Sequence, residues 1–215
     1  MSRLTDRRRG VSGSKANDNP YIKDGLVLWL DGINKGTTDP SKWIDLIGGL
    51  EFVEYNGSNV HGSDCIHLTT STWLYRDGNL DFPPSTHTIE AATSPSKGWQ
   101  FLFASRNSAN IYKDADGRIR CLTKGARYSI TDSKTFGFAG DNIIINGVTA
   151  ETLTLSSLAM ANNVTVINSW SKTAANYCEN FDFYALRIYN RLLTTEEMLY
   201  NQRVDNERFN LGLTL

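Results

Sequence analysis

Acidic side chains in strand-like segments are the first residues that could do chemistry, since paired carboxylates can hydrolyse a glycosidic bond. A retaining mechanism needs the two carboxyl groups about 5–5.5 Å apart, one as nucleophile and one as acid/base. Strand residues two apart point to the same face and can meet this requirement. The nearest candidates, Glu51 with Glu54 and Glu179 with Asp182, are odd-spaced and fall on opposite faces. We therefore expect no catalytic site and no enzyme activity.

Three histidines and three cysteines are the other residues that could bind a metal or act as nucleophiles: His61, His67, His87, Cys65, Cys121 and Cys178. No His-x-His, His-Glu-x-x-His or Cys-x-x-Cys spacing occurs among them, so neither a metal site nor a disulfide framework is predicted. We expect three separate core thiols in a protein made in a reducing cytoplasm. His67 and His87 could meet in space, but each is expected to be a hydrogen-bonded strand histidine. The sequence also lacks the Gly-x-Ser-x-Gly elbow of a serine hydrolase.

The segment from Asp114 to Gly117 imitates the start of a calcium-binding loop. An EF-hand loop requires a glutamate at its twelfth position. Counted from Asp114, that position is Gly125. The Asp116-Gly117 pair favours a tight turn between two strands, so we predict a hairpin turn here and no cofactor.

Aromatic side chains are the candidates for sugar binding, because their faces pack against the C–H faces of pyranose rings. Trp73 and Trp170 lie beside polar threonine, serine and asparagine residues, and Tyr75 follows Trp73 two residues later. We predict Trp73, Tyr75 and Trp170 as a possible glycan-binding surface. The alternative for each is core packing, which large aromatic side chains usually serve.

Length and composition describe one globular domain. The chain has 215 residues, of which 40% are hydrophobic and 21% charged, enough to bury a sizeable core. A net charge of -1 argues against a nucleic-acid-binding protein. No apolar run approaches the roughly 20 residues that span a bilayer, and no apolar segment follows the basic N-terminus, so we expect neither a membrane span nor a secretion signal.

Residues 1–20 differ from the rest of the chain. They are rich in glycine, serine and asparagine and contain Arg3, Arg7, Arg8 and Arg9. Such a segment cannot by itself bury enough surface to offset its ordering entropy, so it is either a free tail, as termini usually are, or an arm that a partner holds. Guanidinium groups pair bidentately with carboxylates on a neighbouring subunit. We predict an attachment arm at 1–20 and a folded domain at 21–215.

Short strand-like segments separated by turn residues fill the domain. They are 26–31, 50–55, 65–70, 72–76, 86–92, 99–105, 110–114, 118–123, 126–131, 136–139, 142–147, 152–157, 164–168 and 181–189. Asp-Gly and Asn-Gly pairs and Gly/Asn/Ser clusters separate them. This pattern excludes an α/β fold and predicts an all-β, two-sheet antiparallel sandwich or jelly roll.

The last predicted strand is followed by the one predicted helix. Strict alternation over 181–189 puts Phe181, Phe183, Ala185, Arg187 and Tyr189 on one face and Asp182, Tyr184, Leu186 and Ile188 on the other. Both faces have apolar groups, which favours a central strand covered on each side.

The helix start is marked by a capping box. With Thr194 as N-cap, Glu197 stands at N3, and Leu193 with Met198 supplies a hydrophobic staple. These signals agree on one short C-terminal helix.

Three segments together resemble laminin-G-like, concanavalin A-like lectin/glucanase domains. Residues 21–31 (YIKDGLVLWLD) resemble the first strand, 43–49 (WIDLIGG) the turn that follows it, and 183–198 (FYALRIYNRLLTTEEM) the closing strand and helix start. The resemblance covers residues 21–210. It implies a jelly-roll sandwich with structural roles for Trp29 and Trp43, and it leaves open calcium on a rim loop.

The resembling domains are of bacterial and bacteriophage type. They imply an accessory virion protein, on the capsid as decoration or head fibre or on the tail, that binds other virion proteins through its arm. We expect a homo-oligomer that contacts host-surface or mucosal glycans, with no specific nucleic acid. The alternative is a carbohydrate-binding module of a bacterial or phage surface protein.

Overall fold

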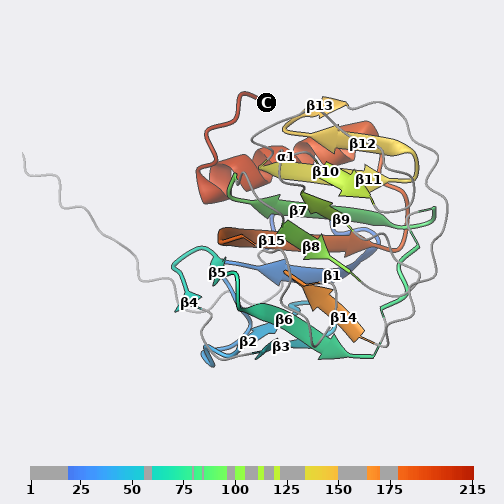
Figure 1. Ribbon diagram of the computed structural model, residues 1–215. Helices are drawn as coiled ribbons and strands as arrows, with labels where there is room; N and C mark the ends of the chain where they lie inside the picture. The colour runs from blue at the N-terminus through green and yellow to red at the C-terminus, as the bar shows by residue number, and fades with distance from the viewer. Residues whose placement is uncertain are drawn as a thin grey trace, which may run out of the picture.

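The structure is a computed structural model that describes residues 19–55, 60–78, 80–83, 85–95, 100–104, 111–113, 119–121, 134–149, 164–169 and 179–215. These residues form the strands β1 (Leu26–Asp31), β2 (Lys42–Ile44), β3 (Glu51–Tyr55), β4 (Val60–His61), β5 (Ile66–Leu68), β6 (Trp73–Asp77), β7 (Thr88–Thr93), β8 (Gln100–Phe103), β9 (Ile111–Lys113), β10 (Ile119–Cys121), β11 (Thr135–Ala139), β12 (Asn142–Ile145), β13 (Val148–Thr149), β14 (Val164–Ile167) and β15 (Phe181–Tyr189), and the helix α1 (Thr195–Phe209) (Figure 1).

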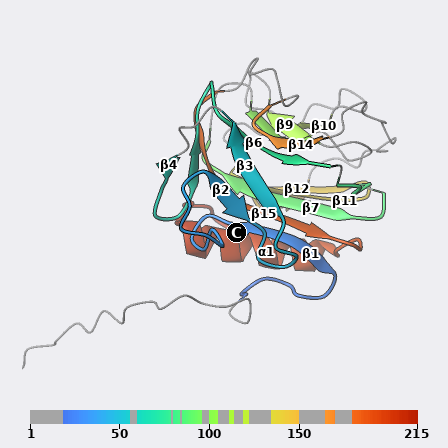
Figure 2. The same ribbon diagram turned by 90° about the horizontal axis from the view of Figure 1, so that it is seen from below.

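Two layers of antiparallel strands form a sandwich. The larger sheet has the order β13-β12-β11-β7-β15-β5-β4, and β1 pairs with the second half of β15. The second layer consists of a four-stranded sheet, β14-β6-β3-β2, and a three-stranded sheet, β10-β9-β8, with β8 beside β14. Figure 2 shows this second layer on one side of the larger sheet and α1 on the other. The predicted all-β antiparallel sandwich with one C-terminal helix is confirmed.

The main hydrophobic core lies between the two layers. Trp43 and Phe52 from the four-stranded sheet are fully buried in it against the larger sheet. The Trp43 ring meets Phe183 edge-on at a centroid distance of 5.5 Å, and its Nε1 donates a hydrogen bond to the carbonyl of Asp31 at 3.1 Å. Trp29 is also buried, on the helix side of the larger sheet. The structural roles expected for Trp29 and Trp43 are confirmed.

Asp45 explains the turn that follows Trp43. Its carboxylate accepts hydrogen bonds from the backbone N–H groups of Trp29 at 2.7 Å, Ile47 at 3.1 Å and Gly48 at 2.7 Å. Asp45 is 1% exposed, so these donors supply the partners that a buried carboxylate requires. The carboxylate thereby joins this turn to β1.

A β-bulge in β15 overturns the predicted division of its two faces. The register against β7 shifts between Phe183 and Ala185, and an extra residue in a strand reverses the alternation beyond it. Phe181 and Phe183 therefore share the inter-layer core with Leu186 and Ile188. The remaining residues of the predicted first face, Ala185, Arg187 and Tyr189, are buried outside that core, towards α1.

Helix α1 begins as the sequence predicts. The Thr194 hydroxyl accepts from the Glu197 N–H at 3.2 Å, and the Glu197 carboxylate accepts from the Thr194 N–H at 2.9 Å. Arg191 also pairs with Glu197, at 2.6 Å. Together these contacts lower the pKa of Glu197 to about 2, with the Arg191 hydrogen bond as the main cause.

The face of α1 that rests on the larger sheet is largely polar. Asn201 and Asp205 are fully buried there. Arg187 of β15 donates two hydrogen bonds to Asp205, each 2.6 Å long, and Asn201 donates to Glu90 of β7 at 2.6 Å. Tyr21 donates to Asp205 at 2.9 Å, and its ring lies under the Arg187 guanidinium. The helix is thus held to the sheet by a buried ion-pair network, defined here as Arg187, Asp205, Glu90, Asn201 and Tyr21.

Some predicted segments lie outside the described residues: residues 1–18 of the arm, the Asp114–Gly117 turn, and the strands at 126–131 and 152–157. Of the other predicted strands, those at 26–31 and 181–189 have the predicted ends and the rest have shifted ends, and the structure adds the short strands β2, β4 and β13. Within the part of the chain that is described, no helix has the length and apolar character of a membrane span.

Candidate functional site

Two groups of side chains outside the inter-layer core are candidates for a binding site. The first lies on the outer face of the four-stranded sheet. Antiparallel pairing places Tyr55 of β3 opposite Trp73 of β6, and Val53 opposite Tyr75. The intervening Leu74 points into the core, so the alternation of β6 turns Trp73, Tyr75 and Asp77 outward.

Trp73 is buried, which confirms the core-packing alternative and excludes an exposed ring at this position. Its ring is 2% exposed because Tyr55, the residue opposite it, stacks on it at a centroid distance of 4.4 Å and an interplanar angle of 17°. Tyr55 also meets Tyr75 edge-on at 6.1 Å. Tyr55 and Tyr75 remain partly exposed. We call Tyr55, Trp73 and Tyr75 the aromatic surface. Its two partly exposed rings are those of Tyr55 and Tyr75.

Trp170 lies outside the described residues, and its glycan-binding role stays a prediction. The preceding chain is held beside the aromatic surface. Asn168 is buried at the end of β14, and its side-chain amide donates to the carbonyls of Thr69 at 3.0 Å and Thr72 at 2.8 Å. These bonds tie the end of β14 to the turn that enters β6.

The arginines of the predicted arm, Arg3, Arg7, Arg8 and Arg9, also lie outside the described residues. The first described residues contact α1. Tyr200 donates to the carbonyl of Pro20 at 3.1 Å, and the N–H of Ile22 donates to the side chain of Asn201 at 3.0 Å. Asn19 is 8% exposed, and its side chain accepts from the N–H of Tyr21 at 2.9 Å. Residues 19–22 are thus attached to the helix side of the sandwich.

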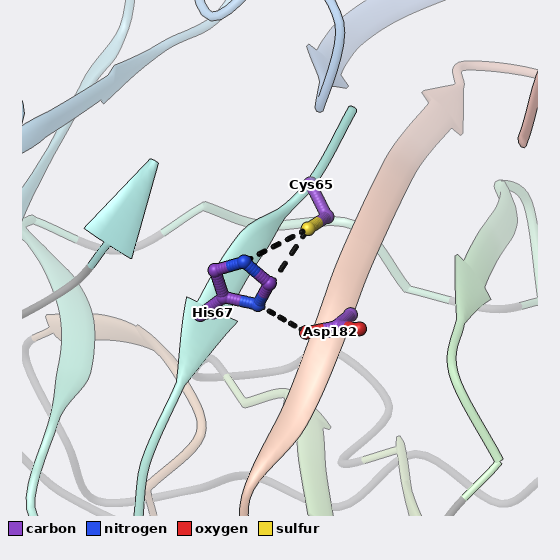
Figure 3. A group of neighbouring side chains, drawn as sticks. All are labelled: Cys65, His67 and Asp182. Carbon is purple, nitrogen blue, oxygen red and sulfur yellow. Dashed lines mark hydrogen bonds and ion pairs between the residues drawn. The ribbon is translucent and has the colours of Figure 1, made fainter. Parts of the chain in front are cut away.

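The second group consists of Cys65, His67 and Asp182 at the start of β15 (Figure 3). Antiparallel pairing of β5 with β15 puts His67 directly opposite Asp182, and His67 Nδ1 is hydrogen-bonded to Asp182 Oδ1. Cys65 precedes His67 by two residues, so its side chain lies on the same side of β5. The metal-ligating atoms of the three residues lie within 4.8 Å of one another. The expectation of a hydrogen-bonded strand histidine is confirmed for His67.

The thiol of Cys65 is free and 3% exposed. Burial is the main cause that raises its pKa to about 12, with the charges of Asp182 and Asp64 adding to the shift. Cys65 Sγ lies 3.7 Å from both ring nitrogens of His67, so it cannot lie on the lone-pair axis of either one. A protonated, misaligned thiol does not fit a nucleophile activated by a base.

The loop between β4 and β5 is held against the cluster. Lys35 donates to the carbonyl of Gly62 at 2.8 Å, and the N–H of Gly62 donates to the carbonyl of Cys65 at 3.0 Å. Asp64 and Asp182 bring negative charge, and the Lys35 ammonium brings one positive charge. On the other side, Tyr184 stacks on Phe209 of α1 at 5.2 Å. Burial is the main cause that raises the pKa of the Tyr184 hydroxyl to about 12.

Sequence spacing alone did not reveal this cluster. Cys65-Ile-His67 is a same-face pair once the segment is known to be a strand, and that signal was present in the sequence. Asp182 is 115 residues from His67. The antiparallel register, which no local pattern encodes, brings it into contact with the histidine.

The chain matches no protein-family model and no curated protein sequence. Among solved structures it is similar to Trypanosoma rangeli sialidase in complex with sialic acid, with a TM-score of 0.60 and 14% identity over 86% of this chain and 33% of that chain. It is also similar to the binding domain of Botulinum Neurotoxin DC in complex with SialylT, with a TM-score of 0.58 and 13% identity over 84% of this chain and 52% of that chain.

A third likeness is to the botulinum neurotoxin serotype D binding domain, with a TM-score of 0.53 and 13% identity. The chain spans about a third of the length of the sialidase and about half of the neurotoxin binding domains. At these identities the likeness concerns the fold. The antiparallel sandwich described above thus has the concanavalin A-like lectin fold.

Proposed function

We propose that the chain is a non-catalytic carbohydrate-binding module. The observation that supports this proposal most is its lectin-like fold, which it shares with a sialidase in complex with sialic acid and a neurotoxin binding domain in complex with SialylT. An outward aromatic surface on the second layer adds a means of binding, because tyrosine rings offer an apolar face to a pyranose and a hydroxyl to its polar edge.

Tyr55 and Tyr75 are the residues that we propose for sugar stacking. Both are partly exposed, while Trp73 is buried and supports Tyr55 from below. Asp77 continues the same face of β6 and is exposed. A carboxylate at that place would accept hydrogen bonds from sugar hydroxyls. Stacking rings beside a polar acceptor are a common composition for a small-ligand surface.

A glycan array that contains neutral and sialylated glycans tests the proposal with the purified full chain. We expect reproducible binding to one class of glycan, and Tyr75→Ala and Tyr55→Ala should each weaken it about tenfold, the equivalent of about 1.4 kcal/mol. Tyr200→Ala is the matched control, because Tyr200 is an exposed tyrosine on α1, on the other side of the sandwich. Absence of binding across the array, or equal losses in all three variants, would contradict the proposal.

We also propose, from the resemblance to phage-type domains, that the chain is displayed on a bacteriophage particle by the arm at its N-terminus. The attachment of residues 19–22 to α1 favours this arrangement. An arm that leaves from the helix side would keep the aromatic surface, on the opposite side of the sandwich, turned towards glycans.

Deletion of residues 1–18 tests this display. The cut leaves Asn19 and its contacts in place, so we expect the truncated domain to melt within about 2 °C of the full chain. The truncated domain should be missing from purified particles that contain the full chain. If it is incorporated at the level of the full chain, the arm does not attach the domain.

A further inference from the structure

We propose that Cys65 and His67 bind a zinc ion, and that Asp182 orients His67 for this role. None of the three residues belongs to the aromatic surface. The proposal starts from the chemistry of the donors: thiolate sulfur and imidazole nitrogen are ligands that zinc prefers. A carboxylate bonded to the second ring nitrogen of a ligating histidine is the usual outer partner of such a site.

The distances fit this ion. A tetrahedral zinc with bonds of about 2.3 Å to sulfur and about 2.0–2.1 Å to nitrogen holds those two atoms about 3.6 Å apart. Cys65 Sγ lies 3.7 Å from the Nε2 atom of His67. Because Nδ1 is already bonded to Asp182, Nε2 is the nitrogen left to ligate. Because Sγ is equally far from both ring nitrogens, the ring must turn substantially before the Nε2 lone pair points at an ion beside Sγ, and water would complete the coordination.

Gly62 leaves the space that the ion needs. A Cβ atom at this position would lie 2.7 Å from Cys65 Sγ and 2.9 Å from His67 Nε2. The backbone of Gly62 does not require glycine, because its φ is outside the left-handed region. Any other residue would place a carbon atom between the two ligands, close to where a bound ion would sit.

The surrounding charges favour a cation. The negative charges of Asp64 and Asp182 act on the thiol, and the Lys35 ammonium, which is bonded to the Gly62 carbonyl at 2.8 Å, opposes them. Zinc takes up the thiolate as its ligand, so its binding releases one proton from Cys65 to the solvent. Half-exposed His67, with 45% of its side chain accessible, leaves a path for entry.

Titration with zinc tests the site, using reduced full-length protein from which any affinity tag has been removed. We expect one zinc ion per chain and a zinc-dependent rise in melting temperature. With cobalt in place of zinc, we expect an absorption band from charge transfer between the thiolate and the metal. Cys65→Ser and His67→Gln should weaken binding at least 100-fold, and Cys65→Ser should abolish the cobalt band. Gly62→Ala should weaken binding similarly while both ligands and Asp182 remain.

The variant Asp182→Asn tests whether Asp182 orients His67 or binds the zinc ion itself. We expect a 10- to 100-fold weaker affinity with the cobalt–thiolate band retained. The matched controls are Cys121→Ser, on β10 of the other layer, and His87→Gln, whose Nδ1 is bonded to Thr86; both should bind zinc as the wild type does. Less than one zinc per chain in the wild type, or a cobalt band that survives Cys65→Ser, would overturn the proposal.

Discussion

Asp205→Ala is expected to lower the free energy of unfolding by about 3–5 kcal/mol, the usual cost of removing one partner from a buried ion pair. Arg187 and Asp205 are both fully buried and are joined by two hydrogen bonds of 2.6 Å. Without Asp205 the guanidinium keeps only the 3.3 Å contact with Glu90 among the acidic groups described. Tyr21 would also lose the acceptor of its hydroxyl.

Urea unfolding of the wild type and the variant measures this loss. Glu51→Ala is the control, because it removes an ion pair of similar length, 2.9 Å to Lys42, whose side chains are 33% and 51% exposed. Solvent screens such a pair, so the control should change stability far less. Equal losses in the two variants would show that the buried network does not hold α1 to the sheet.

The second large effect is a fall in stability between about pH 4.5 and pH 7 that depends on Glu90. The pKa of Glu90 is raised from 4.5 to about 7; burial is the main cause, the Arg187 charge opposes the rise, and the Asp205 charge adds to it. Glu90 Oε1 is buried and has no hydrogen-bond partner among the described residues, an arrangement that disfavours a carboxylate. A neutral Glu90 leaves the Arg187–Asp205 pair electrically balanced.

The direction follows from proton linkage. The folded protein keeps the Glu90 proton up to about pH 7, whereas the unfolded chain releases it near pH 4.5. The stabilisation is therefore complete below pH 4.5 and is lost as the pH rises through 7. Each pH unit is worth about 1.4 kcal/mol, so the whole window contributes on the order of 3 kcal/mol.

Unfolding free energies from pH 4 to pH 8 measure this effect. We expect Glu90→Gln to flatten the slope between pH 5 and pH 7, since glutamine does not titrate. Glu197→Gln is the matched control: the pKa of Glu197 is lowered to about 2, so its contribution is present above pH 4.5 and is lost only as the pH falls towards 2. An unchanged slope in Glu90→Gln would mean that another group causes the pH dependence.

Local sequence patterns by themselves determined most of the described strands, the helix start and the class of fold. Alternating apolar residues between turn signals define strands because side chains alternate on a pleated chain. The capping box of Thr194 and Glu197 is equally local, since all its atoms lie within one helical turn. Such features depend on neighbours a few residues away, and the sequence shows those neighbours directly.

Features that depend on cross-strand register required the tertiary structure. The bulge between Phe183 and Ala185 reverses the alternation of β15, so that it changes which side chains face the helix. The residue types in that segment do not predict a bulge. Trp73 has polar neighbours in sequence, yet Tyr55 from another strand covers its ring. Burial is decided by what lies opposite a residue, which sequence neighbours do not reveal.

The Cys65–His67–Asp182 cluster shows the same division. Residue types and same-face spacing place Cys65 and His67 together, and those are properties of the sequence. The contact with Asp182 exists because β5 pairs with the first residues of β15 in one register. A shift of one residue would turn Asp182 to the opposite face. The sequence alone thus determined the donors, while only the pairing of distant strands, set by burial of the whole sheet, decided that they meet.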